Sequence, residues 1–339
     1  MNAKHLILIL VLALTPQAFA QGFAGLGSDA DGFAQPSRNT RFTFPQDHGP
    51  HTDFRIEWWY ITANLTGPDG TDYGIQWTLF RSALTPDGQA IWLGHAALTT
   101  PTDHFVAERL ARGGIGQAGV TAQPFEAWID DWQMSGIDGG TLKARGFNFA
   151  YALTLNSTTP FVPQGDSGYS VKSASGQASH YYSQPFYTVT GTLDLPDGPI
   201  KVTGQAWLDR EWSSQPLAED QSGWDWFSLH LDDGAKLMGF RLRADSGDYT
   251  SANWIEPDGT PHPLPPGALQ LEPLQTTIVN NREIPTTWRL RLPAHAFDVT
   301  VTAINPQSWM ATSVPYWEGP VRATGSHPGR GYLEMTGYD

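Results

Sequence analysis

Apolar and polar residues alternate along short stretches of this chain, and turn-forming residues separate one stretch from the next. The clearest case is EWWYITANL, from Glu57 to Leu65, followed by a GPDG segment and a second alternating stretch from Tyr73 to Arg81. A period of two is typical of β-strands, and a Pro-Asp-Gly turn between two such runs predicts a hairpin. If Leu65 pairs with Tyr73, Glu57 lies opposite Arg81 at the end of a largely apolar surface.

A second hairpin repeats the first. Trp226 to Leu231, an Asp-Gly turn and Lys236 to Arg243 follow the same pattern, and the corresponding pairing places Asp225 opposite Arg241. A repeated supersecondary unit indicates duplication. The sequence therefore predicts an all-β protein with two similar antiparallel β domains.

Between the hairpins the pattern predicts further short strands and a single helix. Ile91 to Thr99 reads as a strand that carries His95 on the same face as Leu93 and Ala97. Asp103 to Arg112 reads as the one short helix, with Asp103 as its N-cap and basic residues near its C-terminal end.

The ends of the predicted domains follow from local composition. Residues 1–20 have the basic, apolar and small-residue regions of a secretory signal, which predicts export to the periplasm or the medium. We assign residues 21–53 to an N-terminal arm, 54–215 to the first β domain and 216–339 to the second, with the change between Ser213 and Gly223.

Charge and composition narrow the partners. The chain has 20 Lys and Arg against 34 Asp and Glu, a net charge of −14, which argues against nucleic acid and anionic membrane surfaces. No stretch after the signal is a candidate membrane span. The zinc signatures HExxH and CxxC are absent from the sequence, and we expect no cofactor and no metal ion.

Carboxylates supply the candidate chemistry. Asp209 and Glu211 are two residues apart in a predicted strand, so they share a face and lie about 7 Å apart, a separation suited to acid and base roles. Alternatively, they belong to a charged turn in which Arg210 neutralises its neighbours. Glu57 with Arg81 is either a buried ion pair that closes a barrel or a carboxylate with a tuned pKa. The candidate catalytic residues are Glu57, Asp209, Glu211 and Asp225.

Aromatic residues supply the candidate pocket. Most of the 14 tryptophans are expected to fill domain cores. The candidate ligand-binding residues are Trp59, Trp77, Arg81, His95, Trp212, Trp226, Tyr316, Trp317 and Glu318.

Several motifs in order along the chain carry a family resemblance: EWWY at Glu57, FRSAL at Phe80, AERLARGG at Ala107, DREWS at Asp209, GWDWFSLHLDDG at Gly223, YWEGPV at Tyr316 and GYLEMTGY at Gly331. They resemble the AttH/CrtC group of duplicated lipocalin-like proteins, which are often described as predicted secreted hydrolases and are related to carotenoid 1,2-hydratase (hydroxyneurosporene synthase). The resemblance implies two calycin barrels. The first would hold the ligand, the second would pack against it, and a further cleft would lie between them. It also implies that Trp58 or Trp59 packs on Arg210.

The resemblance implies two functions of different kinds. The first is an exported protein that binds a hydrophobic, lipid-like or isoprenoid molecule in its N-terminal barrel, beside an ABC-type transporter. The alternative is a hydrolase or hydratase that uses carboxylate acid/base catalysis. The carotenoid enzymes carry a histidine where this chain has Arg210, and arginine does not titrate near neutral pH, so we do not expect carotenoid hydration. A purely structural envelope protein is a third hypothesis.

Overall fold

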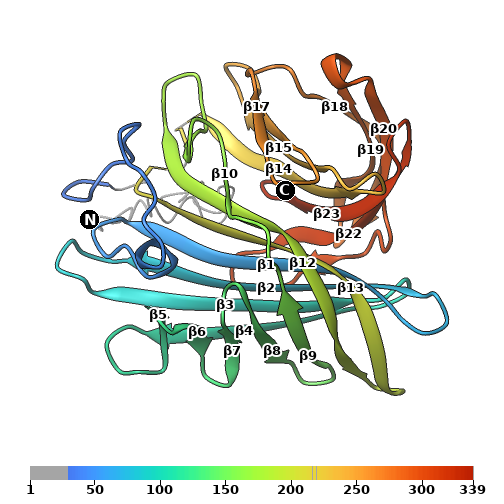
Figure 1. Cartoon of the computed structure of the whole chain (residues 1–339), viewed down its shortest axis with the longest axis horizontal. Coiled ribbons are helices and arrows are strands. Elements are labelled where there is room, and N and C mark those ends of the chain that lie inside the picture. Colours follow the sequence, from blue (N-terminus) through green and yellow to red (C-terminus); the bar gives the residue numbers. More distant parts are fainter. Residues whose placement is uncertain (1–29, 216, 219, 339) are drawn as a thin grey trace, which may run out of the picture.

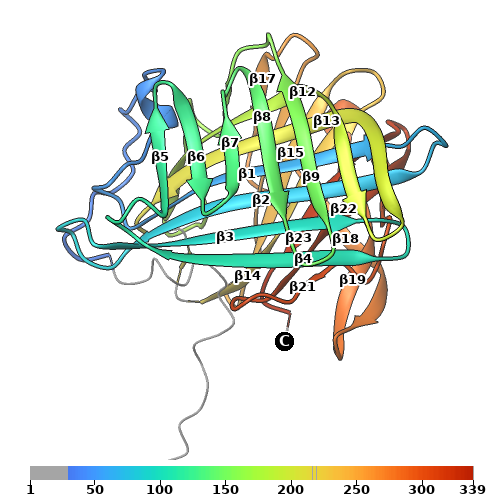
Figure 2. The same ribbon diagram turned by 90° about the horizontal axis from the view of Figure 1, so that it is seen from below.

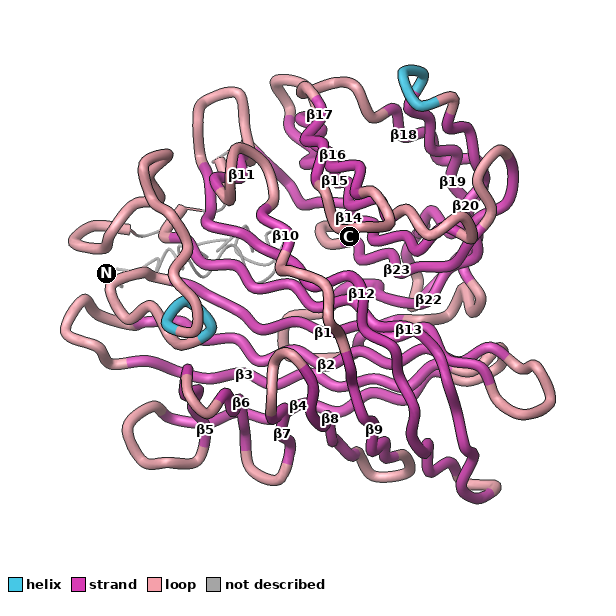
Figure 3. The backbone as a smooth tube through the Cα atoms, in the orientation of Figure 1, coloured by secondary structure: helices cyan, strands magenta, loops and turns pink. Residues whose placement is uncertain are grey.

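The computed structural model describes residues 30–215, 217–218 and 220–338, so the predicted signal at residues 1–20 and the start of the arm lie outside the described residues. The regular secondary structure of the described residues is almost entirely strand, and the strands form two curled antiparallel sheets, a nearly closed barrel and a half-barrel packed against it (Figures 1 and 3). No helix among the described residues is long and apolar enough to cross a membrane.

The first sheet has 13 strands, and its main path runs in the order β4-β3-β2-β1-β13-β12-β9-β8-β7-β6-β5. β5 to β9 cross over β1 to β4 and so form the opposite wall of the barrel (Figure 2). Its strands are β1 (Ile56–Thr66), β2 (Asp72–Ala83), β3 (Ala90–Thr99), β4 (His104–Arg112), β5 (Ala118–Ala122), β6 (Phe125–Ile129), β7 (Trp132–Ser135), β8 (Gly139–Arg145), β9 (Ala150–Asn156), β10 (Val162–Pro163), β11 (Tyr169–Val171), β12 (Ala178–Leu195) and β13 (Gly198–Ser213).

The second sheet has 10 strands, and its main path runs in the order β17-β16-β15-β14-β23-β22-β20-β19-β18. Its strands are β14 (Gln221–Leu231), β15 (Lys236–Ala244), β16 (Tyr249–Ile255), β17 (Pro261–Leu264), β18 (Gln270–Val279), β19 (Arg282–Leu292), β20 (Phe297–Ala303), β21 (Trp309–Met310), β22 (Tyr316–Gly325) and β23 (Gly329–Met335). The chain passes from one sheet to the other between Ser213 and Gln221.

The predicted helix at Asp103 to Arg112 is wrong, because this segment is strand β4, paired along its length with β3. Phe105 and Ala107 pack against the barrel core, and Val106 between them packs on the other face of the sheet against the cluster that contains Leu93 and Ala97. Pairing with β3 and burial of this face outweigh the helix propensity of AERLAR. Helical structure among the described residues is limited to two single 3-10 turns, η2 (Gln46–His48) and η3 (Pro293–His295).

Both predicted hairpin registers are confirmed. Leu65 pairs with Tyr73 and Glu57 with Arg81, while Asp225 pairs with Arg241 in the second sheet. The duplication extends further, because β2-β1-β13-β12 in the first sheet corresponds to β15-β14-β23-β22 in the second. If the two halves are aligned so that Glu57 corresponds to Asp225, then Trp58 corresponds to Trp226. Their cross-strand neighbours, Glu211 and Glu334, then correspond as well.

Strand β1 is buried on both faces, and this positions the site. Trp59, Ile61 and the alternate residues that follow point into the first barrel and are fully buried. Tyr60, on the other face, packs with Trp226 of the second sheet at 5.3 Å between ring centroids. The seam between the two sheets is therefore an aromatic layer in addition to the two barrel cores.

Candidate functional site

A cavity of about 90 Å³ lies within this seam, several times the space that one buried water needs. β1, β2, β12 and β13 supply one side, and β14, β15, β22 and β23 supply the other. Eight of its lining side chains are aromatic: Trp58, Tyr60, Phe80, Tyr181, Trp224, Trp226, Phe240 and Tyr316. Five are polar: Lys172, Asp209, Glu211, Glu334 and Thr336.

Asp209 is the most enclosed carboxyl group of the cavity. Its Oδ1 accepts hydrogen bonds from Ser183 Oγ at 2.5 Å and Trp207 Nε1 at 2.6 Å, and its Oδ2 accepts one from Tyr181 O–H at 2.5 Å. Burial raises the pKa of Asp209 to about 7, although these three hydrogen bonds oppose the rise. Tyr181, which lines the cavity, in turn accepts from Trp226 Nε1 at 3.2 Å.

Glu211 pairs with a lysine. Its Oε1 lies 2.8 Å from Lys172 Nζ and also accepts a hydrogen bond from Ser179 Oγ. Lys172 follows the short strand β11, and its ammonium group lies 4.9 Å from the ring centroid of Tyr181 and 4.5 Å from that of Phe240. Lys172, the one cationic side chain that lines the cavity among the described residues, therefore pairs with Glu211 over aromatic faces.

Glu334 corresponds to Glu211 in the duplicated half but has no cation beside it. Among the described residues its only hydrogen-bond partner is Trp224, whose Nε1 donates to Oε1 at 2.6 Å. Burial, with the charges of Asp209 and Glu211, raises the pKa of Glu334 to about 7. The two related glutamates thus differ in their partners, since Glu211 pairs with a lysine and Glu334 accepts from an indole N–H.

A second polar network reaches the cavity through its tyrosines. Tyr60 O–H donates to Glu318, a buried carboxyl whose pKa is raised by burial. The Tyr316 hydroxyl lies 3.0 Å from His95 Nδ1, and His95 Nε2 lies 3.2 Å from Glu108 Oε1. This network joins β1, β3, β4 and β22 across the seam.

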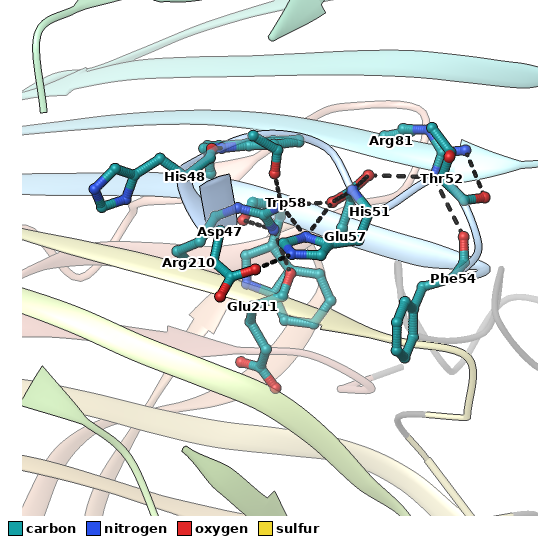
Figure 4. Close-up of polar contacts among 12 residues, drawn as sticks. Asp47, His48, His51, Thr52, Phe54, Glu57, Trp58, Arg81, Arg210 and Glu211 are labelled. Atoms are coloured by element: carbon teal, nitrogen blue, oxygen red, sulfur yellow. Dashed lines mark hydrogen bonds and ion pairs between the residues drawn. The ribbon is translucent and has the colours of Figure 1, made fainter. Parts of the chain in front are cut away.

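Glu57 lies on the opposite face of β1, inside the end of the first barrel (Figure 4). Its Oε1 is 3.2 Å from Arg81 Nη1, its Oε2 is 2.5 Å from Arg210 Nη2, and the His51 amide donates to Oε2 at 2.9 Å. Burial opposes ionisation, yet Arg210, His51 and Arg81 lower the pKa of Glu57 to about 2. In Figure 4 the Glu211 carboxylate points away from this cluster.

The N-terminal arm covers the Glu57 cluster. Trp59 Nε1 donates to the His48 carbonyl at 2.8 Å, and Arg210 Nη2 donates to the Gly49 carbonyl at 2.6 Å. Arg210 also lies 3.9 Å above the Trp59 ring, which is the contact implied by the family resemblance. These contacts, together with the ion pair to Glu57, hold the guanidinium within the barrel end, so Arg210 has a structural role.

Asp225 occupies the equivalent place in the second sheet. Its carboxylate oxygens lie 2.7 Å from Arg241 Nη2 and 2.6 Å from Arg243 Nη1, and Tyr338 O–H donates to it at 2.8 Å. Among the described residues, no three His, Cys, Asp or Glu side chains cluster so that they would hold a metal ion.

Comparison with known proteins assigns the family. A family model described as AttH-like matches residues 35–338. The chain belongs to the AttH-like family. An AttH-like protein from Nitrosomonas europaea has a similar structure, with 32% identity, a TM-score of 0.82, and coverage of 91% of this chain and 100% of that one. No curated protein sequence gives a significant match.

Two more distant structures share the fold. Kievitone hydratase from Nectria haematococca is 14% identical, with a TM-score of 0.67 and coverage of 94% of this chain and 98% of that one. CghA, solved with Sch210972, is 13% identical, with a TM-score of 0.55 and coverage of 84% and 89%.

In this AttH-like protein the predicted site residues separate into three groups. Those that line the cavity are Asp209, Glu211, Trp226 and Tyr316, with His95 and Glu318 bonded to its tyrosines. Those inside the first barrel or at its covered end are Glu57, Trp59, Trp77, Arg81 and Trp212. Those on the inner face of the second sheet are Asp225 and Trp317.

The described cavity lies between the sheets, whereas the resemblance placed the ligand inside the first barrel. Large side chains, including Trp59, Trp77 and Trp132, fill that barrel's interior. Each tryptophan there occupies space that a ligand would need, and the arm covers the barrel end. The cavity between the sheets lies where the resemblance implies a further cleft between the barrels.

Sequence reasoning missed several polar groups of the cavity, which are Lys172, Glu334, Thr336 and the hydroxyl groups of Tyr60 and Tyr181. Glu334 had a signal, because GYLEMTGY has an acid at the end of its strand as DREWS does. Lys172 had none, since it follows a strand of three residues and reaches Glu211 only through the tertiary fold.

Proposed function

We propose that the cavity between the sheets binds an apolar, lipid-like small molecule and adds water to it, or removes water from it, by acid/base catalysis. The observation that carries this proposal is the pair of related glutamates. Glu334 has a pKa raised to about 7 and one neutral partner, whereas Glu211 is ion-paired with Lys172. Two carboxyl groups in one cavity that differ in protonation are suited to the roles of acid and base.

In the hydration direction, protonated Glu334 donates its proton to one carbon of a substrate double bond. The π electrons form the new C–H bond, and positive charge develops on the other carbon, where aromatic faces stabilise it. Water then forms the C–O bond and gives its proton to the Glu211 carboxylate. Proton exchange with solvent returns both glutamates to their starting states, and dehydration follows the same steps in reverse.

The names of two proteins of the same fold support this chemistry. One is a hydratase of kievitone, and the other was solved with the small molecule Sch210972. Both fit a cavity that accepts an organic molecule between aromatic walls.

The test begins with native mass spectrometry and organic extraction of the protein purified from its own cells. Any extracted compound is returned to the protein in ¹⁸O-labelled water, and label incorporation is measured for the wild type, Glu334→Gln, Glu211→Gln and the control Glu283→Gln, which lies exposed on β19. We expect incorporation in the wild type and the control, and its loss in both cavity variants. Incorporation that survives Glu334→Gln would contradict the acid role.

Binding without turnover is the second candidate, and the saturation of Asp209 favours it. The Asp209 carboxyl group already accepts three hydrogen bonds, from Tyr181, Ser183 and Trp207, as structural carboxylates do. A stoichiometric extracted ligand that takes up no label from the solvent would support this function.

We further propose export to the periplasm and action beside an ABC-type transporter, on the strength of the signal-like residues 1–20 and the family resemblance. Cell fractionation tests the location, because the mature chain should begin at Gln21 in the periplasmic fraction. Cross-linking in those cells tests the partner and should recover a transporter subunit.

A further inference from the structure

We infer that the cavity between the sheets prefers an organic cation, such as an alkylammonium group on an otherwise apolar ligand. The inference rests on the proposed function only in taking this cavity as the ligand site. It agrees with binding without turnover, because a cation beside Glu334 favours the ionised carboxylate and so removes the acid of the proposed hydration.

The first reason is an imbalance of charge among the described residues that line the cavity. Three carboxyl groups, Asp209, Glu211 and Glu334, meet one cationic side chain, Lys172. Lys172 lies 2.8 Å from Glu211 and compensates that group. The hydrogen-bond partners of the other two carboxyl groups are hydroxyl and indole groups, which carry no charge.

A neutral apolar ligand would make this imbalance worse. It would exclude water from Asp209 and Glu334 and bring no positive charge, and a carboxylate without a counter-charge is costly in an apolar environment even when neutral groups donate hydrogen bonds to it. A cationic ligand would supply the missing positive charge. The acidic protein as a whole, with a net charge of −14, would also attract cations toward the cavity.

The second reason is the aromatic wall, which already holds a cation. The Lys172 ammonium group lies within 5 Å of two ring centroids, at 4.9 Å from Tyr181 and 4.5 Å from Phe240. Tyr60 and Trp226 stand at 88° to one another, so neighbouring walls present a face and an edge. Aromatic faces around a small cavity are the usual means of binding alkylammonium groups.

The preference should depend on pH in a defined direction. A bound cation favours the ionised forms of Asp209 and Glu334, so binding releases protons and strengthens as pH rises through their pKa of about 7. The other titratable groups that face these carboxyls are Glu318, which lies opposite Glu334 on the neighbouring strand β22, and Lys172, Glu211, Tyr60, Tyr181 and Tyr316. Burial raises the pKa of the three tyrosines well above their ordinary value of 10.0, so they stay protonated from about pH 6 to 8.

The experiment compares two probes of the same shape on the full chain. Choline and 3,3-dimethyl-1-butanol differ in that a quaternary nitrogen replaces a quaternary carbon. Isothermal titration calorimetry at about pH 8 should show choline bound at least about tenfold more tightly than the alcohol. At about pH 6 the preference should shrink, because Asp209 and Glu334 become neutral. Equal or tighter binding of the alcohol at the higher pH overturns the inference.

Variants locate the effect. Glu334→Gln keeps the shape of the side chain and should lower choline affinity while binding of the alcohol is kept, and Trp226→Leu should weaken both probes. Glu283→Gln makes the same change at an exposed site and should alter neither. If choline affinity is unchanged in Glu334→Gln, the inference is wrong. If the alcohol binds and only Trp226→Leu weakens it, the ligand site stands without the preference for a cation. If neither cavity variant changes the binding of either probe, the cavity is not the ligand site, and the proposed function is wrong as well.

Discussion

Two glutamates, Glu57 on β1 and Glu334 on β23, show how far environment decides the chemistry of a residue. Glu57 is fully buried but contacts two guanidinium groups, so its pKa falls to about 2. Glu334 has only an indole N–H, so burial dominates and its pKa rises to about 7. The ordinary value for both is 4.5. The Glu57 carboxylate therefore stabilises the fold, whereas the Glu334 carboxyl group has a pKa suited to proton transfer near neutral pH.

The first prediction concerns Glu57→Gln. Removing one partner of a buried ion cluster leaves Arg81 and Arg210 uncompensated, so the free energy of unfolding should fall by about 3–5 kcal/mol in urea denaturation. The wild type should lose about 3 kcal/mol of this stabilisation as pH falls from about 4.5 to 2, since the folded-state pKa is the lower one. An unchanged urea midpoint with lost ligand binding would instead show that Glu57 is functional.

The second prediction concerns Glu334→Gln, for which the expected change in the free energy of unfolding has the opposite sign. Because the folded-state pKa of Glu334 is raised, its contribution to stability is complete below about pH 4.5 and is lost as pH rises through about 7. A neutral glutamine avoids that loss, so the variant should be more stable than the wild type at pH 8, by on the order of 1–3 kcal/mol, and equal to it at pH 4. Urea denaturation at both pH values measures this. A variant that is less stable at pH 8 would show that the Glu334 carboxylate is compensated in the folded protein.

At the scale of elements, β1 and β14 are central because each is covered on both faces. One face of each strand packs into its own barrel or half-barrel, and the other packs into the seam.

The two sheets are in close contact where β2 crosses β22 and β23. A methyl group at Gly74 would lie 2.5 Å from the Tyr332 hydroxyl oxygen and 2.6 Å from the Pro320 ring. Residue 74 is therefore glycine because a larger side chain does not fit at this crossing, and not because of its backbone conformation.

The third prediction follows from this crossing. Gly74→Ala should lower the free energy of unfolding by about 1–3 kcal/mol, because the sheets must separate to admit the methyl group. Gly139→Ala is the matched control, since a methyl group at that exposed strand position has its nearest contact at 3.5 Å. Thermal melts of both variants measure the difference. Equal melting temperatures would mean that the two sheets admit the methyl group without loss of stability.

At the scale of the whole molecule, the candidate site belongs to neither sheet. Asp209 and Glu211 come from β13, whereas Glu334 and Trp226 come from β23 and β14. The site therefore exists only when the two sheets are docked. Residues that cover one another across the seam, such as Tyr60 and Trp226, would be exposed in either half alone.

The fourth prediction concerns separated halves. A chain of residues 30–215 and a chain of residues 220–338 should each expose the aromatic seam, bind the dye ANS and associate in analytical ultracentrifugation. Mixing them should reduce dye binding if they dock. Halves that are monomeric and do not bind the dye would show that the seam contributes little to folding.

The sequence by itself determined the strands of both hairpins, their registers and the duplication. Alternation and a tight turn act over a few residues, and a turn of fixed length sets which residues face one another, as Glu57 and Arg81 do. The same local signals placed Asp209 and Glu211 on one face of a strand.

Only the tertiary structure decided what each face meets. Local propensity favoured a helix at Asp103 to Arg112, but pairing with β3 made it a strand. Alternation assigned Trp59 and Tyr60 to opposite faces of β1, yet only the docked second sheet shows that the face of Tyr60 borders the cavity. Lys172 reaches Glu211 from a distant loop, and Glu334 reaches the same cavity from the last strand. Such contacts depend on how two sheets pack, which no periodicity within one segment can encode.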